Sequence, residues 1–258
     1  MPLLHPGRAL ILAAPQDGRY FFILPWNGNS LIGTTDTPYE GKLEDVSVTE
    51  NDVHYLLEAA SFYLPKWHLE PSSVISSFAG VRPLVMRKNV PASSISRKHL
   101  LHVSSSGLIN ILGGKYTIYR RMAEETVDLI TSTPCKTASS PLYAENYSEE
   151  EMRQRMEKMK LPLPLREHLL ANYGPGTMAI LTIVERSPEE GKQICPLHPH
   201  IFAELTYAIE NEYVVKPEDW FERRTSIAYT PCRGKSCAEV VADKIKSYKH
   251  RIDQLQTL

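Results

Sequence analysis

Two glycines and a lysine, Gly113, Gly114 and Lys115, stand between a strand-like run and a helical pattern, and they constrain the fold more than any other stretch. Residues 108–112 are apolar except for Asn110, whereas residues 119–130 repeat apolar side chains at helical spacing. A strand that enters a helix through this turn leaves backbone N–H groups and a cation at the helix N-terminus, which favours an anion or an electron-rich ring as ligand. The chain contains no Gly-x-Gly-x-x-Gly turn, the usual sign of a dinucleotide site. We therefore expect half of an active site.

Charge and cysteine usage exclude several classes of protein. The 258 residues carry 29 Lys and Arg against 30 Asp and Glu, so a broad basic face for nucleic acid is not expected. No apolar run approaches the roughly 20 residues that span a bilayer. Four cysteines at scattered positions indicate a reduced intracellular protein rather than a disulfide scaffold. The length is sufficient for two domains.

The first half of the chain predicts a sheet with one intervening helix. Thr49 and Asp52 form a capping box for that helix, and Pro65 ends it. Turn signals at residues 16–18 and 27–28 separate the first apolar runs. The expected strands cover residues 9–13, 20–24, 31–33, 72–84, 95–103 and 108–112.

The second half predicts helices only. Residues 131–147 are rich in Ser, Thr and Pro without a clear period, so we assign them to a linker. Beyond it, Ser148 caps a helix, Gly174 stops one and Pro199 suits the first turn of another. The expected organisation is α+β, with a mixed or antiparallel sheet domain over residues 1–130 and an all-α domain over residues 148–258.

Three cations of the first domain lie next to turns or strand ends: Arg82, Arg97 and Lys115. A guanidinium matches phosphate or carboxylate oxygens with two hydrogen bonds, whereas lysine supplies a point charge. Taken singly, each arginine more often pairs with a structural carboxylate. Together they predict a pocket for a small phosphorylated or carboxylated molecule. Thr35 could add a hydroxyl, although a simple turn explains its cluster equally well.

A segment with one cysteine and two histidines, Cys195, His198 and His200, resembles a metal cluster at first sight. Zinc sites usually need a second ligand pair at close spacing, and four residues separate Cys232 from Cys237. The prolines and the irregular spacing favour a loop, so no metal site is predicted.

Several motifs together resemble the FAD-dependent glycerol-3-phosphate dehydrogenases, nearest the mitochondrial-type branch. The similarity covers nearly the whole chain and is most specific from Asp17 to Ile130. It is carried by residues 17–26, 31–38, 79–84, 94–97, 106–109 and 113–124, and more loosely by residues 203–204, 212 and 223–225.

The resemblance implies a fold and a set of site residues. Residues 1–130 would form the substrate-binding sheet and the returning strand and helix of the FAD domain. Arg82 and Lys115 would be catalytic, and substrate oxygens would be held by Thr35, Arg82, Arg97 and Lys115. The residues that would contact FAD are Gly113, Gly114, Lys115, Tyr116 and Thr117.

The resemblance also implies an activity and partners. Such enzymes oxidise sn-glycerol 3-phosphate to dihydroxyacetone phosphate and pass electrons to quinone at a membrane surface, either the mitochondrial inner membrane or the cytoplasmic face of a bacterial plasma membrane. The main FAD-binding half has no counterpart in these motifs, so we expect a partial chain, inactive alone, that needs a separate N-terminal FAD-binding half. Two alternatives stay open: a non-catalytic helical assembly partner, and a stand-alone module that binds small phosphometabolites.

Overall fold

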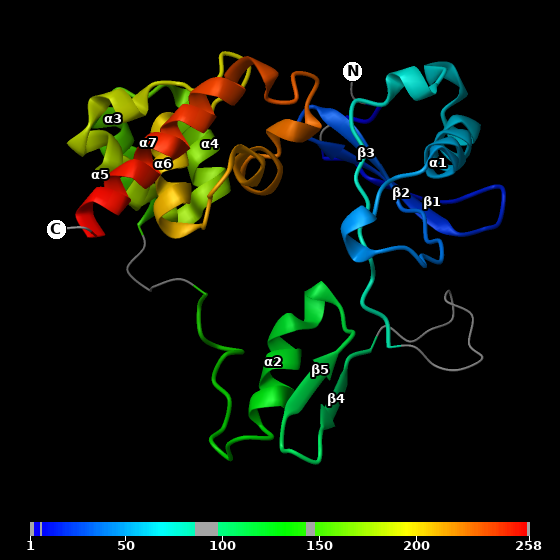
Figure 1. Cartoon of the computed structure of the whole chain (residues 1–258). Coiled ribbons are helices and arrows are strands. Elements are labelled where there is room, and N and C mark those ends of the chain that lie inside the picture. Colours follow the sequence, from blue (N-terminus) through cyan, green and yellow to red (C-terminus); the bar gives the residue numbers. More distant parts are fainter. Residues whose placement is uncertain (1–2, 6, 86–97, 143–147, 257–258) are drawn as a thin grey trace. The chain divides into compact units, whose positions relative to one another are not determined.

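The structure is a computed structural model that describes residues 3–5, 7–85, 98–142 and 148–256, with side chains described as far as residue 248. The chain divides into two compact units, Met1–Leu142 and Tyr143–Leu258. Among the described residues, the first unit contains two small antiparallel sheets and two α-helices, and the second is helical (Figure 1). The predicted α+β class is confirmed.

A three-stranded antiparallel sheet opens the first unit, in the order β1-β2-β3. Gly18 and the pair Asn27 and Gly28 have positive φ angles at the two turns, as the predicted hairpins require. Phe21 and Ile23 of the middle strand are fully buried. The strands are β1 (Leu10–Ala13), β2 (Tyr20–Trp26) and β3 (Asn29–Gly33).

Helix α1 (Glu50–Tyr63) covers this sheet. The predicted capping box is present: the backbone N–H of Asp52 donates to Thr49 Oγ1 across 3.2 Å, and that of Thr49 donates to Asp52 Oδ2 across 3.1 Å. Ala59 and Ala60 have no exposed surface and pack against the buried face of β2. The small alanine side chains let the helix approach the sheet closely.

The second sheet is a hairpin of β4 (Leu100–Val103) and β5 (Ile109–Leu112), followed by α2 (Tyr119–Val127). Residues 104–107 form the turn that closes it, since Gly107 N–H donates to Ser104 O across 2.9 Å and Gly107 has a φ of 84°. The glycine-lysine turn therefore does connect a strand to a helix, through one 3-10 turn over Tyr116–Ile118.

Two predictions for these elements need correction. The strand over residues 72–84 is wrong: a 3-10 turn over Pro71–Ser73 leads into irregular chain, which pairs with no strand among the described residues. An apolar run is typical of extended backbone. A β-strand also needs an adjacent strand that forms hydrogen bonds with its N–H and C=O groups. Helix α2 ends at Val127 rather than Ile130. Of the expected strand 95–103, residues 95–97 lie outside the described residues.

The second unit is built from five α-helices: α3 (Glu149–Lys158), α4 (Leu163–Tyr173), α5 (Thr177–Arg186), α6 (Phe202–Asn211) and α7 (Ala238–Gln256). Ser148 Oγ caps α3, and Gly174 ends α4, as predicted. Pro199 precedes α6 instead of lying in its first turn. A π-helical turn spans Asp219–Arg224, and further 3-10 turns lie at Leu43–Asp45, Pro65–Trp67, Gly174–Gly176, Pro188–Gly191, Ile227–Tyr229 and Lys235–Cys237.

Two apolar clusters hold the helical unit together. One lies among α3, α4 and α5 and includes Met152, Leu169 and Leu181, all without exposed surface. The other surrounds Trp220 and joins α6 to the start of α7 through Leu205. None of the described helices has both the length and the apolar content that crossing a bilayer requires.

Candidate functional site

Arg82 lies against the polar residues that follow β3. Its Nη2 donates to Thr34 Oγ1 across 3.4 Å, and its Nη1 lies 3.5 Å from Asp36 Oδ2. The Asp36 carbonyl in turn accepts from Arg19 Nη1 at 2.9 Å. About a third of the Arg82 side chain stays exposed at 34%. These two neighbours position the guanidinium. Because both contacts are long and a guanidinium has five N–H donors, Arg82 can still donate to a further anion.

Thr35 faces the start of α1. Its hydroxyl is a hydrogen-bond partner of the Asp52 carboxylate, which also accepts from the Thr49 hydroxyl at 2.6 Å. Burial of the carboxylate opposes ionisation, but these hydrogen bonds outweigh it and lower the pKa of Asp52. Thr35 is therefore tied to the helix cap, whereas its neighbour Thr34 contacts the arginine.

The glycine pair adopts backbone that other residues rarely reach. Gly113 and Gly114 have φ angles of 69° and 99°. A β-carbon on Gly113 would lie 3.3 Å from Lys98 O and 3.4 Å from Pro83 O, two backbone atoms that cannot move aside easily. Pro83, which directly follows Arg82, therefore lies beside the glycine pair. Only glycine suits this close approach.

An open hollow of about 650 Å³ lies beside the turn. Gly114, Lys115 and Tyr116 form one edge, and the side chains of α2, among them Met122, form another. Lys115 and Thr117 are exposed, and Tyr116 is 91% exposed. The hollow is mostly apolar and open, and the Met122 side chain lies over Gly114, where an added β-carbon would be 2.5 Å from Met122 Cε.

The predicted site residues are thus only partly assembled by contacts in the structure. Arg82 joins Thr34 and Asp36, and Pro83 meets Gly113. Arg97 lies outside the described residues, so its place in the site stays a prediction.

Sequence reasoning did not single out His99. Its Nε2 lies 2.6 Å from Glu125 Oε2 on α2, and its β-carbon lies 3.3 Å from where a side chain on Gly114 would begin. Hydrogen bonds from His99 and Arg121 lower the pKa of Glu125. The pair fastens the start of the hairpin to α2. No local signal marks it, because the two residues are 26 positions apart.

The cysteine-histidine segment is a loop, as predicted. Its side chains belong to two separate clusters: Cys195 and His198 lie near Cys232, and His200 lies near Glu204. His200 Nδ1 and His168 Nε2 lie 2.9 and 2.8 Å from Glu204 Oε1, while Ile201 N–H donates to Glu204 Oε2 across 2.6 Å. Glu204 is fully buried. Burial opposes its ionisation, yet the hydrogen bonds lower the pKa of Glu204 to about 2. The carboxylate caps α6.

Two family models match successive parts of the chain. Residues 2–120 match the model described as FAD dependent oxidoreductase, and residues 135–254 match the C-terminal domain of alpha-glycerophosphate oxidase. The second matched region begins at residue 135, within the Ser-, Thr- and Pro-rich stretch over residues 131–147, and residues 121–134 lie between the two matches.

Curated relatives and a solved structure agree. Glycerol-3-phosphate dehydrogenase of Synechocystis is 34% identical over 235 residues, covering 86% of this chain and 42% of the relative. The probable mitochondrial enzyme of Dictyostelium discoideum is 36% identical over 245 residues, covering 88% and 38%.

The crystal structure of the Bacillus halodurans glycerol-3-phosphate dehydrogenase, complexed with FAD, is 30% identical and superposes with a TM-score of 0.71. It covers 97% of this chain and 53% of that one. The chain thus spans about two fifths of the length of these curated relatives and about half of the crystallised protein. On both family models and these similarities, the chain belongs to the FAD-dependent glycerol-3-phosphate dehydrogenase family.

Proposed function

We propose that this chain forms the substrate side of an enzyme that oxidises the C2 hydroxyl of sn-glycerol 3-phosphate to give dihydroxyacetone phosphate. The observation that carries the proposal is the position of Arg82, held by Thr34 and Asp36 and followed directly by the residue that meets Gly113. An arginine in this place can bind an oxyanion next to the ring-sized hollow.

Arg82 and Lys115 have different roles in this proposal. The guanidinium binds the C2 oxygen of the substrate and stabilises the negative charge that develops there during oxidation. Thr35, Arg97 and Lys115 hold the phosphate, and the lysine reaches the substrate from its exposed place at the turn. Because the phosphate of the substrate has two acidic oxygens, several cationic side chains can bind it better than a single one can.

The glycine pair fits FAD. Gly113 and Gly114 carry no side chains and line the hollow, whose apolar surface suits an isoalloxazine ring. Lys115, Tyr116 and Thr117 extend this edge. When bound, FAD supplies the acceptor for the hydride that leaves C2. The N–H groups and the Lys115 charge at this helix start favour an electron-rich ring.

Exposed apolar side chains support a need for a further FAD-binding part. On the three-stranded sheet, Ile11 is 65% exposed and Tyr20 is 72% exposed. Leu100 and Leu112, which are paired across the β4-β5 hairpin, are also exposed. Apolar surface of this extent usually packs against other polypeptide. We therefore propose that the 258 residues bind little FAD and do not turn over without a complementing FAD-binding segment.

Quinone at a membrane surface is the proposed electron acceptor, through peripheral contact rather than a spanning helix. The proposal rests on the family resemblance. A vesicle-flotation assay of the complemented enzyme, with reduction of a soluble quinone analogue as a second readout, tests it. An enzyme that reduces only oxygen and stays in solution would contradict it.

The experiment that tests the activity joins residues 1–258 to the preceding part of the Bacillus subtilis aerobic glycerol-3-phosphate dehydrogenase, a relative 34% identical over 241 residues. We expect the fusion to show flavin absorbance and to reduce a dye with glycerol 3-phosphate, whereas the 258 residues alone do neither. Arg82→Ala should abolish turnover while the fusion keeps its flavin.

Arg153→Ala is the matched control, because Arg153 pairs with Glu149 and Glu167 on the helical unit. It should retain activity. A flavin-loaded fusion that is active with Arg82→Ala, or inactive without any substitution, would contradict the proposed role. Binding of the substrate by the isolated chain, seen as heat on titration, would favour the phosphometabolite module instead.

A further inference from the structure

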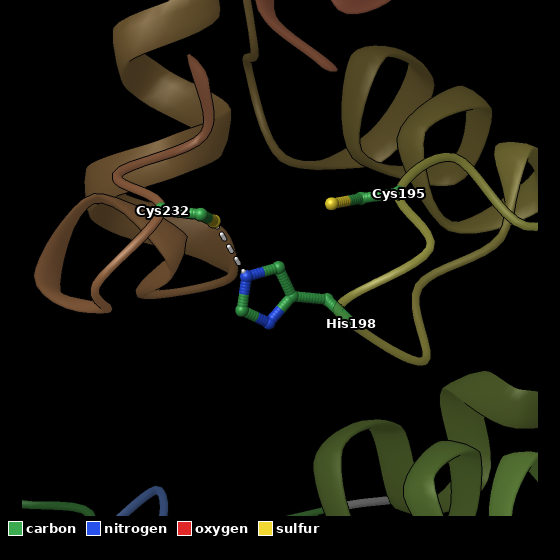
Figure 2. A group of neighbouring side chains, drawn as sticks. All are labelled: Cys195, His198 and Cys232. Atoms are coloured by element: carbon green, nitrogen blue, oxygen red, sulfur yellow. Dashed lines mark hydrogen bonds between the residues drawn. The ribbon is translucent and has the colours of Figure 1, made fainter. Parts of the chain in front are cut away.

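Two loops of the helical unit bring two thiols and an imidazole together. Cys195 and His198 lie on the loop before α6, and Cys232 lies in the turn before α7. The ligand atoms of all three lie within 4.8 Å of one another, and His198 Nε2 is 3.0 Å from Cys232 Sγ. Figure 2 shows the imidazole of His198 directed toward Cys232, while the Cys195 side chain comes from the same loop as His198.

The two cysteines stand at the start of turns with the same construction. His198 N–H donates to Cys195 O across 3.2 Å, and Lys235 N–H donates to Cys232 O across 3.0 Å. In each turn the backbone N–H two residues beyond the cysteine also donates to its sulfur, from Leu197 in the first and from Gly234, across 3.4 Å, in the second. Such donors stabilise a thiolate, the form of cysteine that binds metal.

Backbone geometry holds both turns in place. Pro196 is the second residue of the first turn, where its fixed φ is favourable. Arg233 and Gly234 have positive φ angles of 49° and 73° in the second turn. The first loop is also fastened by Gln193 Nε2, which donates to His198 O across 2.6 Å. The three side chains are therefore positioned by the chain itself.

Hydroxyl groups surround the cluster. Thr230 Oγ1 lies 3.3 Å from His198 Nε2 and 3.5 Å from Cys232 Sγ, and Ser236 Oγ lies 3.3 Å from Cys195 Sγ. Cys237 interacts with Cys195 and is almost fully buried, with 1% of its surface exposed. It is the nearest further thiol for a fourth position. Metal ligands commonly have such partners around them.

We propose that Cys195, His198 and Cys232 bind a zinc ion. Two thiolates and one imidazole are the donor set that Zn²⁺ prefers over Mg²⁺ or Ca²⁺. Zinc bonds of about 2.3 Å to sulfur and 2.0 Å to nitrogen separate tetrahedral ligand atoms by roughly 3.5–3.8 Å, so small side-chain movements close the site. The ion would join the loop before α6 to the turn before α7, and the three protein ligands leave its fourth tetrahedral position for water or for the Cys237 thiol.

Metal analysis of the purified 258-residue chain, produced in zinc-supplemented medium, tests the proposal. We expect about one zinc per chain, as a single site requires. Cys232→Ser and His198→Asn should each lose most of it. Cys135→Ser is the matched control, because Cys135 is an exposed free thiol in the other unit, and it should keep the zinc. A zinc-free parent chain, or folded variants that keep zinc, would overturn the proposal.

A second measurement uses the unaltered chain, so it does not depend on whether a variant folds. Chelation should lower the thermal midpoint of the helical unit, and zinc but not magnesium should restore it. Replacement by cobalt should add thiolate-to-metal charge-transfer absorption in the near ultraviolet. No change of midpoint on chelation, together with a cobalt spectrum that lacks the thiolate band, would show that the two turns hold free thiols.

Discussion

Arg82 reaches Thr34 across 48 positions of sequence, and its Nη2 donates to the threonine Oγ1 at 3.4 Å. The same guanidinium lies 3.5 Å from the Asp36 carboxylate. One arginine thus meets a hydroxyl and an anion that both follow the last strand of the first sheet. In the proposed function a bound substrate adds a third oxygen to this set, so we expect activity to depend on the fork of the guanidinium as well as on its charge.

Arg82→Lys in the fusion enzyme therefore tests geometry at constant charge. A lysine ammonium cannot reproduce the planar donor fork, so we expect kcat/KM for glycerol 3-phosphate to fall roughly 10- to 100-fold, the usual value of lost hydrogen bonds to charged groups. Thr34→Val, which removes a neutral partner, should cost about fivefold. Steady-state dye reduction measures both. Equal kinetics for Arg82→Lys and the parent would mean that only charge matters there.

Gly113→Ala is expected to destabilise the β4-β5 hairpin and α2. The new β-carbon meets two carbonyl oxygens at 3.3 and 3.4 Å, and the positive φ adds about 1–2 kcal/mol of strain. Gly107→Ala is the control, since φ is 84° there but nothing lies within 4 Å of the new atom. Hydrogen exchange of the β5 amides should be faster in Gly113→Ala than in Gly107→Ala. Similar exchange in both would mean that the close approach is unimportant.

Local signals predicted much of the first unit. The capping box at Thr49 depends on four consecutive residues, and the hairpin turns depend on glycine and asparagine at fixed places, so each could be read without knowing what lies nearby. The strand over residues 72–84 failed because it required a partner. Apolar residues indicate extended chain, but they do not say which strand lies alongside.

The cysteine cluster was not predicted for the same reason: it depends on residues that are far apart in the sequence. His198 and Cys232 are 34 positions apart, and their contact depends on how the loops before α6 and α7 are packed. The spacing of the cysteines alone favoured a loop without metal. Only the structure shows that both cysteines begin matching turns. The sequence predicts Arg82 as a site residue from its neighbours along the chain, whereas its contacts with Thr34 and Asp36 are seen only in the fold.

Thr35→Val separates the two tasks assigned to this hydroxyl. If the Thr35 hydroxyl binds substrate, its removal should weaken substrate binding by about 1 kcal/mol. We therefore expect KM for glycerol 3-phosphate to rise roughly fivefold in the fusion enzyme. Thr35→Ser should keep the parent KM. Thr37→Val, at an exposed neighbour, is the control. If Thr35→Val leaves KM unchanged and only loosens the start of α1, the hydroxyl serves Asp52 alone.

Glu204 is expected to make the helical unit sensitive to acid. Its hydrogen bonds with His168 and His200 lower its pKa from 4.5 to about 2 despite complete burial. A carboxyl group with a lowered pKa stabilises the fold fully above its unfolded-state pKa and loses this contribution as the pH falls through the folded-state value. The thermal midpoint should therefore fall between about pH 4.5 and pH 2.

Glu204→Gln removes this titration, and it also replaces a charged acceptor by a neutral amide within a buried network. We expect the variant to lose about 2–4 kcal/mol of stability near neutral pH, because two histidines and a helix N-terminus lose their anionic partner. Its stability should then change less than that of the parent below pH 4.5. Glu239→Gln, at an exposed glutamate in the first turn of α7, is the control and should keep the acid transition. Faster hydrogen exchange of the α6 amides would locate the effect, and parallel acid curves for Glu204→Gln and the parent would assign the transition to another group.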